Sequence, residues 1–529
     1  MVDVTMNVAY TPVKVVNHPK FVNGPSKDLG LKDIEKATRC CSILKTIGLV
    51  LVVITAVSSL IGMIIIWKSG LIDNMISQKL VIERDTHVYD VWVKPPVKPV
   101  VNVYLFNYTN IPQFAAGKEK LKIQEVGPYA YRLSFEKVRV LFKTNNTISF
   151  QEKKNYQFDP DLSNGTLSDV ITVPNIALLS AVARVVGKNV FYQMPLVTLV
   201  GGLNVEAFQQ LKVQELLWGY EDPLYDMARP ILNLVDDVPD KLGLLVGKNG
   251  TGEERFTIFT GMSDINQLGV IAEFRDKKKL NIWKSDECNR IDGSEGSMFP
   301  PPQVAAGKRL FVFLPQLCRR MPFDAKKHMI TNGMPAVRYA PPADVFSADN
   351  PDNACYCVKG KCPPSGVFDV GPCAFDGPLL ASFPHFFQGD PALLEQYEGL
   401  NPIAEKHQFY IDIHDRFGVP LGGKSRLQIS IIAKNAKYFP SMKMFKKDMI
   451  LPMSWFEVSV DDLPPEVKSD LKLATHTATH GLMYFLLFVF VLSSGMVAYQ
   501  ATKMTRVKEP LSPGYNVNLP KQLILVQKI

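Results

Sequence analysis

The sequence predicts an α+β protein in which one large ectodomain lies between two membrane-spanning helices. Three observations support this prediction. Two apolar runs without charged residues lie near the two ends of the chain, β-rich segments recur between them, and residues 174–233 show helical periodicity instead. The chain has 529 residues, 47% hydrophobic and 21% charged, which is the composition of a folded protein long enough to bury a large core.

The two apolar runs cover residues 46–67 and 481–499. The first is long enough for a helix of about 33 Å, which crosses a bilayer. It is not a cleavable signal, because about 45 residues precede it. Basic residues flank both runs toward the chain ends, so the positive-inside rule places residues 1–45 and 500–529 in the cytosol. The ectodomain, residues 68–480, then lies on the opposite side. The net charge of +8 reflects this topology, and no nucleic-acid partner is expected.

Alternating or β-rich segments follow one another along the ectodomain, separated by Gly, Pro or Asn. We expect strands at residues 101–109, 130–143, 255–262, 280–284, 308–314, 408–414 and 426–434. Apolar residues at i, i+3, i+4 and i+7 predict short helices instead at residues 175–189, 204–219 and 222–234. The helical group therefore interrupts an otherwise β-rich domain.

The cysteines and glycosylation sequons agree with this topology. Cysteines outside the cytosol are oxidised, so the six in the ectodomain predict three disulfides rather than a zinc site. Their spacing alone leaves 15 pairings open. These six are Cys288, Cys318, Cys355, Cys357, Cys362 and Cys373. N-glycosylation sequons occur only between the apolar runs, at Asn107, Asn145, Asn164 and Asn249. Cys40 and Cys41 precede the first run and are candidates for S-acylation, with unmodified thiols as the alternative.

The sequence lacks the common catalytic motifs, and we expect neither an enzyme nor a cofactor. No G-x-S-x-G, Walker-type or H-E-x-x-H motif occurs. Residues 247–252, GKNGTG, have the glycines of a phosphate loop without its ending, which favours a glycosylated turn. His476 and His480 have the i, i+4 spacing of paired metal ligands, but no third ligand is near. A spacer next to the membrane is favoured over a metal site.

Several segments of the ectodomain resemble the signatures of a known family. They are VYLFNYTN (103–110), EVGPYAYR (125–132), ELLWGYEDP (215–223), NPDNACYC (350–357), SFPHF (382–386), GLNP (399–402), YIDI (410–413) and RLQ (426–428). In this order and spacing they are similar to those of the class B scavenger receptors, which include fatty acid translocase and a lysosomal integral membrane protein. The resemblance extends from about residue 45 to residue 499.

The resemblance implies a more detailed fold than periodicity does. It implies an antiparallel β-barrel-like ectodomain, capped at the membrane-distal apex by the helical group, with an apolar tunnel running toward the bilayer. It also selects one pairing of the cysteines, namely Cys288–Cys355, Cys318–Cys373 and Cys357–Cys362. A tunnel suits lipid transfer, because each methylene kept out of water contributes about 0.8 kcal/mol.

The resemblance also suggests contacts at the apex. Family members that accept anionic fatty acids carry lysines in the loop that here reads GGLNVEAF (201–208), with Glu206 and no base. Fatty-acid capture at this loop is therefore disfavoured. Arg184 and Lys188 are candidate contacts for an anionic headgroup, with a solvated helix face as the alternative. The candidate apolar contacts are Phe191, Leu196 and Leu199.

Two functions follow from the resemblance. The first is a receptor that binds lipid or lipoprotein and delivers a sterol, carotenoid or acyl lipid to the membrane. The alternative is an adhesion, phagocytic or sorting receptor whose apex binds a protein partner or a dying cell. The expected location is the plasma membrane, with endosome or lysosome as the alternative. Residues 10–13, YTPV, are similar to an endocytic signal, whereas Leu519 stands where a lysosomal dileucine signal has its acidic residue.

Overall fold

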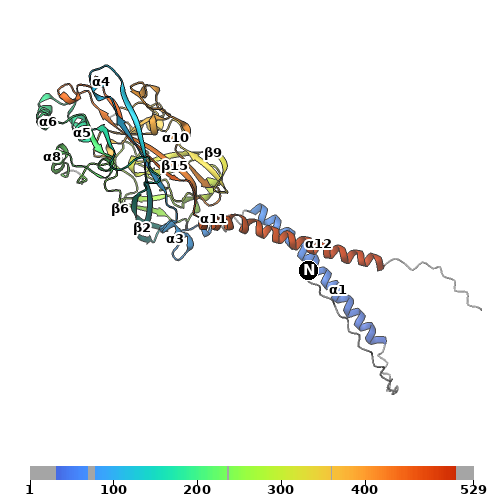
Figure 1. Cartoon of the computed structure of the whole chain (residues 1–529). Coiled ribbons are helices and arrows are strands. Elements are labelled where there is room, and N and C mark those ends of the chain that lie inside the picture. The colour runs from blue at the N-terminus through green and yellow to red at the C-terminus, as the bar shows by residue number, and fades with distance from the viewer. Residues whose placement is uncertain (1–30, 70–77, 235–237, 359, 508–529) are drawn as a thin grey trace, which may run out of the picture. The chain divides into compact units, whose positions relative to one another are not determined.

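The computed structural model describes residues 31–69, 78–234, 238–358 and 360–507 (Figure 1). It divides into two compact units. One unit contains the two long helices near the chain ends, and the other, Gly70–His480, corresponds to the predicted ectodomain, a name that we keep for it. The tail motifs and the side chain of Cys41 lie outside the described residues.

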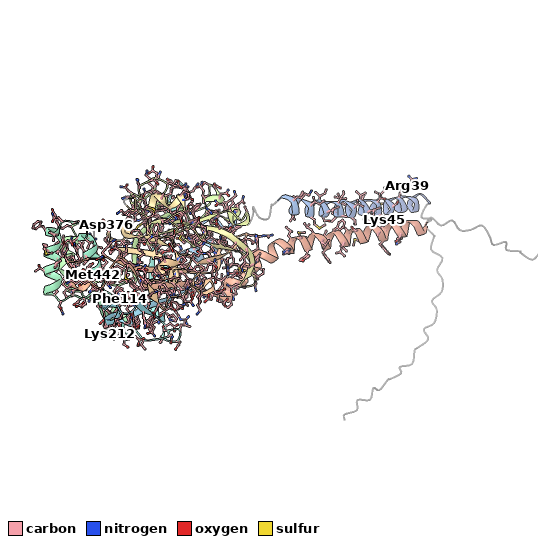
Figure 2. The ribbon with its side chains drawn as sticks, turned by 90° about the horizontal axis from the view of Figure 1, so that it is seen from above. Arg39, Lys45, Phe114, Lys212, Asp376 and Met442 are labelled. Atoms are coloured by element: carbon pink, nitrogen blue, oxygen red, sulfur yellow. A yellow bond between two sulfur atoms is a disulfide. The ribbon has the colours of Figure 1, made fainter. Side chains whose placement is uncertain are left out.

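The two long helices are α1 (Leu31–Ser69) and α12 (Leu482–Val507). Their apolar parts, Ser42–Ile66 and Leu482–Lys503, are long and apolar enough to cross a membrane. Most of their large apolar side chains are exposed, as expected for helices that face lipid. The helices lie side by side (Figure 2). Gly62 faces Leu486 of α12, because a Cβ there would lie 3.6 Å from Leu486 Cδ1, an ordinary contact distance.

The ectodomain combines short helices with long strands. Its α-helices are α3 (His87–Val93), α4 (Ile111–Ala115), α5 (Ile176–Val185), α6 (Val190–Gly202), α7 (Val213–Trp218), α8 (Pro223–Leu232), α9 (Pro301–Ala305), α10 (Ala404–His407) and α11 (Pro465–Lys472). Its strands are β1 (Val100–Tyr108), β2 (Leu121–Lys143), β3 (Thr147–Phe158), β4 (Val170–Pro174), β5 (Phe208–Lys212), β6 (Gly250–Phe259), β7 (Ile271–Phe274), β8 (Leu310–Leu314), β9 (Arg319–Thr331), β10 (Met334–Ala340), β11 (Val367–Asp369), β12 (Leu379–Ser382), β13 (Tyr397–Glu398), β14 (Tyr410–His414), β15 (Pro420–Ala433) and β16 (Met449–Val460).

One large sheet contains most of these strands, with the order β7-β6-β3-β2-β1-β16-β15-β14-β10-β9-β8 along its main path. The strands β11, β12 and β13 pair with it off this path, and β4 and β5 form a separate sheet. The pairings along this path are antiparallel. The first strand therefore lies in the middle of the sheet, between β2 and β16. Tyr104 of β1 stands opposite Trp455 of β16, so the two ends of the ectodomain sequence meet at its centre.

The described strands do not close into a barrel, which corrects the architecture that the family resemblance implies. The edge strands β7 and β8 do not pair with each other. Instead, Gly293 and Ser294 lie between them: Ile271 N donates to Gly293 O at 2.9 Å, and Ser294 N donates to Phe311 O at 2.8 Å. The sheet thus curves until its edges are joined by a short irregular segment. We call this junction the seam.

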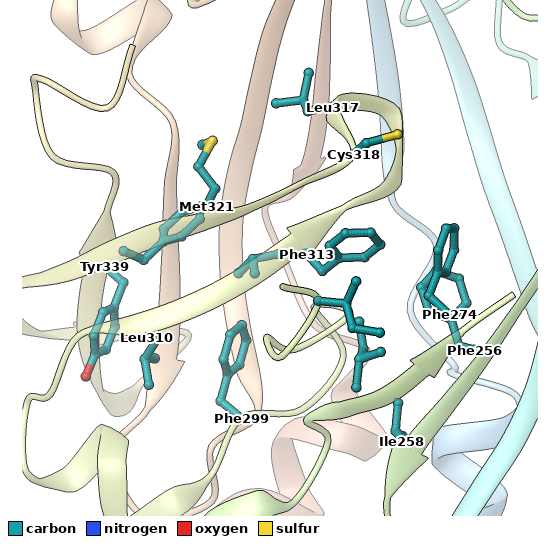
Figure 3. Packing of buried hydrophobic residues seen from close by; sticks show 14 of the residues in the cluster. Phe256, Ile258, Phe274, Phe299, Leu310, Phe313, Leu317, Cys318, Met321 and Tyr339 are labelled. Carbon is teal, nitrogen blue, oxygen red and sulfur yellow. The ribbon is translucent and has the colours of Figure 1, made fainter. Parts of the chain in front are cut away.

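The inner side of the curved sheet near the seam is filled by large apolar side chains (Figure 3). Phe274 of β7 and Phe313 of β8 meet edge to face, with ring centroids 5.0 Å apart. The cluster continues through residues of β6, β9 and β10, including Ile258, Met321 and Tyr339. Edge-to-face rings gain electrostatic attraction beyond their buried area, so this packing holds the edges of the sheet together.

The three disulfides lie beside this core and join the pairs that the resemblance implies. They are Cys288–Cys355, Cys318–Cys373 and Cys357–Cys362. The first two connect residues 67 and 55 positions apart, whereas the third closes a loop of 5. Because a longer closed loop restricts the unfolded chain more, the first two contribute more stability than the third.

Two expected elements differ from the structure. Residues 280–284 form no strand; the Oδ1 of Asn289 instead accepts hydrogen bonds from the backbone N–H groups of Ile282 and Trp283. Residues 204–219 are not one helix, because β5 pairs with β4 before α7 begins. The periodicity of apolar residues therefore predicted the wrong element in both places. A side-chain acceptor decides the structure at the first, and strand pairing decides it at the second.

A buried ion pair fastens β15 to β16. The guanidinium of Arg426 contacts the carboxylate of Glu457 through two nitrogens at 2.7 Å each, and both side chains are 5–7% exposed. Arg426 also donates to the backbone oxygens of Glu405 and Gln408, at 3.2 and 2.9 Å. Both nitrogens contact the same oxygen, Oε2, and this ion pair with the two additional backbone partners offsets much of the cost of burying two charges.

We expect Glu457→Gln to lower the stability of the full-length protein by about 3–5 kcal/mol, because it leaves the buried guanidinium of Arg426 without a counter-charge. Thermal unfolding in detergent measures this loss. Glu136→Gln is the matched control, since it breaks the exposed pair with Lys153 and is expected to cost at most about 1 kcal/mol. Equal effects of the two changes would contradict the role given to the buried pair.

Candidate functional site

The helices α5, α6 and α8 gather at one end of the ectodomain (Figure 1). Together with α7, which follows β5, we call them the helical cluster. Polar side chains set where three of these helices begin. Asn175 accepts from Leu178 N at 2.9 Å, Asn189 accepts from Phe191 N at 3.2 Å, and Asp222 accepts from Leu224 N at 2.9 Å. These caps satisfy backbone donors that the first helical turn leaves free.

The inner face of the helical cluster packs on the sheet. Leu178, Leu179 and Val182 of α5 are completely buried. They belong to one apolar cluster with Phe106 of β1 and Trp455 of β16. The helix α5 therefore packs on β15 and shares one apolar core with the central strands β1 and β16.

The outer surface of the helical cluster exposes aromatic and aliphatic side chains. On α6, Phe191 is 81% and Tyr192 70% exposed, whereas Val200 at the other end of the helix is buried. On α8, Met227 is 56% and Ile231 69% exposed. Large apolar side chains at such exposure mark surfaces that contact a partner or a lipid.

The predicted contact residues fall into three groups. Arg184 donates to the backbone oxygen of Phe375, so its guanidinium ties α5 to the loop after Cys373. Lys188 is exposed, and within the described residues its ammonium forms no hydrogen bond or ion pair. Leu196 and Leu199 are half-buried and pack on the apolar cluster, which leaves Phe191 as the exposed apolar residue of the set. Figure 2 shows Asp376, next to Phe375, near the helices of this end.

The four sequon asparagines have different surroundings. Asn145, Asn164 and Asn249 are exposed. Asn107 is half-buried in β1, and its Oδ1 accepts a hydrogen bond from Thr172 N of β4 at 2.9 Å. Attachment of a glycan needs an accessible side chain, so the first three asparagines suit modification better than Asn107. Cys40 of α1, which precedes the predicted span, is an exposed free thiol.

A cluster of polar and aromatic side chains lies where the helical cluster meets the central strands. The Oε2 atom of Glu125 accepts hydrogen bonds from Trp455 Nε1 at 2.7 Å and from His385 Nε2 at 2.6 Å. Tyr104 stacks on Trp455, with ring centroids 3.9 Å apart, and His407 stacks on His385 at 4.5 Å. We call these five residues the Glu125 cluster. Sequence periodicity could not reveal it, because its members come from five separate segments.

The family-like segments meet at the Glu125 cluster. EVGPYAYR contributes Glu125, and SFPHF contributes His385. GLNP supplies Asn401, whose backbone N–H donates to His385 Nδ1 at 3.0 Å. RLQ supplies Gln428, whose Oε1 accepts from His385 N at 2.7 Å. The imidazole of His385 and its backbone therefore connect these four segments.

The charges around the Glu125 cluster are set by burial and by hydrogen bonds. Burial raises the pKa of Glu125, but the hydrogen bonds from His385 and Trp455 outweigh burial, and the net pKa is lowered. Burial, followed by the nearby His385, lowers the pKa of His407 to about 4. Burial and the carboxylates of Glu457 and Glu125 raise the pKa of Tyr104 to about 12. At neutral pH the cluster thus holds one carboxylate, a neutral His407 and a neutral phenol.

No group of three or more His, Cys, Asp or Glu side chains that could hold a metal ion occurs within residues 31–69, 78–234, 238–358 and 360–507. The features that the structure does provide are two apolar helices, a disulfide-bonded domain and an exposed apolar surface. Together they define a membrane-anchored binding protein.

Comparison with known proteins identifies the family. A family model described as the CD36 family matches residues 48–503. Scavenger receptor class B member 1 of Bos taurus is 31% identical over 429 residues, which cover 81% of this chain and 82% of the relative. Lysosome membrane protein 2 of Homo sapiens is 31% identical over 445 residues, 83% of this chain and 90% of the relative. The chain belongs to the CD36 family.

We expect the protein to lose stability as the pH falls from 7 to 5, in part because of His407. Its folded-state pKa of about 4 lies below the ordinary value of 6.5, so the unfolded chain binds the proton first. The loss begins near pH 6.5 and is complete near pH 4, and at pH 5 it amounts to about 1–2 kcal/mol. Glu125, with a lowered pKa, contributes stability that is lost only at more acidic pH.

His407→Asn tests this assignment, because an amide oxygen can accept from Ile403 N as His407 Nδ1 does, at 2.9 Å, but does not titrate. Thermal unfolding at pH 7 and pH 5 should show a smaller difference in the variant than in the wild type. The other charged groups near His407, namely Glu125, His385, Arg426 and Lys406, are unchanged in the variant. An unaltered pH difference would assign the acid sensitivity to another group.

Proposed function

We propose that this protein is a lipid receptor of the class B scavenger type, whose helical cluster contacts the surface of a lipid particle and whose ectodomain passes apolar lipid to the membrane. The cargo is a neutral lipid such as a sterol ester or a carotenoid. The observation that carries this proposal is the exposed aromatic pair Phe191 and Tyr192 on α6.

Aromatic side chains at this exposure suit an interface between water and lipid. Tyrosine places its ring among acyl chains and its hydroxyl among headgroups, and phenylalanine adds apolar area. Burial of one such side chain contributes about 1.5–3 kcal/mol. Met227 and Ile231 of α8 extend the apolar surface of the helical cluster.

The charges of the helical cluster support a neutral cargo. Arg184 is engaged with Phe375 O, and Arg229 forms an ion pair with Asp240 at 2.7 Å. Lys188 and Lys212 then remain as exposed cations without such a partner among the described residues of α5 to α8 and their connections. A surface with two available cations and the acidic Glu206 attracts a fatty-acid anion weakly.

Delivery through the interior of the ectodomain is the second half of the proposal, and it rests on family membership. An apolar lipid that moves through protein avoids a cost of about 0.8 kcal/mol for each methylene that would otherwise enter water. The proposed location is the plasma membrane with both termini in the cytosol. The name of lysosome membrane protein 2 makes the endolysosomal membrane the alternative.

The receptor function is tested by Phe191→Asp combined with Tyr192→Asp in the full-length protein. We expect binding of lipoprotein and uptake of a labelled cholesteryl ester to fall at least about tenfold, because two apolar anchors are replaced by charges. Both sites are exposed, so folding should persist. Flow cytometry of transfected cells measures surface expression, and cell-associated fluorescence measures binding and uptake.

Ile330→Asp is the matched control, because Ile330 is 68% exposed on β9 and outside the helical cluster. It should leave binding and uptake unchanged. Full uptake by a well-expressed double variant would exclude α6 as the lipid contact. In that case an adhesion or sorting receptor that recognises a protein becomes the better explanation.

Cargo choice is tested at Gly202 in the last turn of α6. A Cβ at Gly202 meets no atom within 4 Å, so a lysine fits there without displacing a neighbour. We expect Gly202→Lys to raise binding of oleate about fivefold, which corresponds to about 1 kcal/mol of Coulomb attraction. Uptake of cholesteryl ester should not change. Gly202→Ala controls for the gain in helix stability. An equal effect of the two variants on oleate binding would contradict selection of the cargo by charge.

A further inference from the structure

A surface pocket of 440 Å³ lies at the seam of the large sheet. We call it the seam pocket. It is bordered by the turn between β2 and β3, the end of β6, strand β7 and the segment that joins the sheet edges. Its lining residues are Asn145, Phe259, Ile271, Ala272, Glu273, Lys278, Arg290, Ile291 and Asp292. Its volume is within the range of about 300–1,000 Å³ that ligand pockets have.

The seam pocket has an apolar part and a charged rim. Phe259 and Ala272 are half-buried and supply its apolar surface, whereas Ile271 and Ile291, each 2% exposed, form the core behind them. The rim charges largely have partners already. Glu273 binds Lys143 at 2.6 Å, and Arg290 binds Asp292 at 2.9 Å.

This combination favours a neutral occupant with both hydroxyl groups and apolar faces. A bare acyl chain would leave the rim groups without water or hydrogen-bond partners, which costs free energy. A strongly charged ligand would have to compete with the existing ion pairs. Lys278 does not change this balance, because its ammonium lies near Glu273 and lowers the pKa of that carboxylate after the larger effect of Lys143. Sugars have the required chemistry, with polar hydroxyls around apolar C–H faces.

A sugar can be supplied by the chain itself. Asn145, which lines the pocket, is exposed and begins the sequon Asn145-Asn146-Thr147. The Thr147 hydroxyl donates to Asn145 Oδ1 at 2.6 Å. Within the described residues, Asn145 Nδ2, the atom to which an N-linked glycan is attached, makes no hydrogen bond. We propose that the first sugars of a glycan on Asn145 occupy the seam pocket and cover the junction between β7 and Arg290–Ser294.

The proposal predicts that this glycan is protected and that it stabilises the fold. The full-length protein would be purified in detergent from cells that glycosylate, and glycopeptide mass spectrometry would measure occupancy at each sequon. A time course of native digestion with an N-glycosidase should release the glycan of Asn145 at least about tenfold more slowly than that of Asn249. Asn145→Gln should lower Tm by about 2–4 °C, and Asn249→Gln, the matched control at an exposed sequon outside the pocket, should not.

Ala272→Trp separates occupancy of the pocket from attachment of the glycan. The indole would fill the pocket and leave the sequon intact, so the glycan of Asn145 should become as accessible to the enzyme as that of Asn249. Three results would overturn the proposal: an unmodified Asn145, equal release rates in the wild type, or continued protection of Asn145 in Ala272→Trp. The helical cluster is unchanged in every variant, so lipid uptake tests the proposed function independently.

Discussion

The carboxylate of Glu125 is the contact on which much of the ectodomain depends. One oxygen atom accepts hydrogen bonds from Trp455 on β16 and from His385 in the turn after β12, and so joins three distant parts of the sequence. Both donors lie on buried rings, and without this acceptor each would bear the cost of an unpaired polar group. The rings that stack on these two, Tyr104 and His407, are positioned by the same bond.

The Glu125 cluster also supports the helical cluster. Trp455 and Phe106, which contacts His385 edge to face at 5.4 Å, belong to the apolar cluster that receives α5. The helix α6, through Val200, belongs to the same apolar cluster. The position of its outer surface therefore depends on a core that the Glu125 contacts help to hold. Five of the family-like segments meet at this place and not on the exposed outer surface of the helical cluster, namely VYLFNYTN, EVGPYAYR, SFPHF, GLNP and RLQ.

The sequence predicted those features that depend on local pattern. Continuous apolar runs predicted the two candidate spans, and alternating apolar residues predicted β1, β2, β14 and β15. Both patterns can be read from neighbouring residues without knowledge of a contact far along the chain. The strand predicted at residues 280–284 is absent, because the side chain of Asn289, and not a neighbouring strand, binds the backbone there. At the candidate site, Leu196 and Phe191 look alike in sequence, but one is half-buried and the other exposed. The contact of Glu125 with His385 spans 260 positions, and no local pattern can reveal it.

The central position of β1 has a consequence for how the protein is made. Its partner β16 is formed by residues 449–460, so during synthesis β1 has one unpaired edge until nearly the whole ectodomain has been made. Contacts of such long sequence separation form slowly, and an unpaired strand edge invites association with other chains. The nascent chain therefore exposes this strand edge for most of its synthesis. A chain truncated before Trp455 would expose that edge permanently and would be prone to associate with other chains.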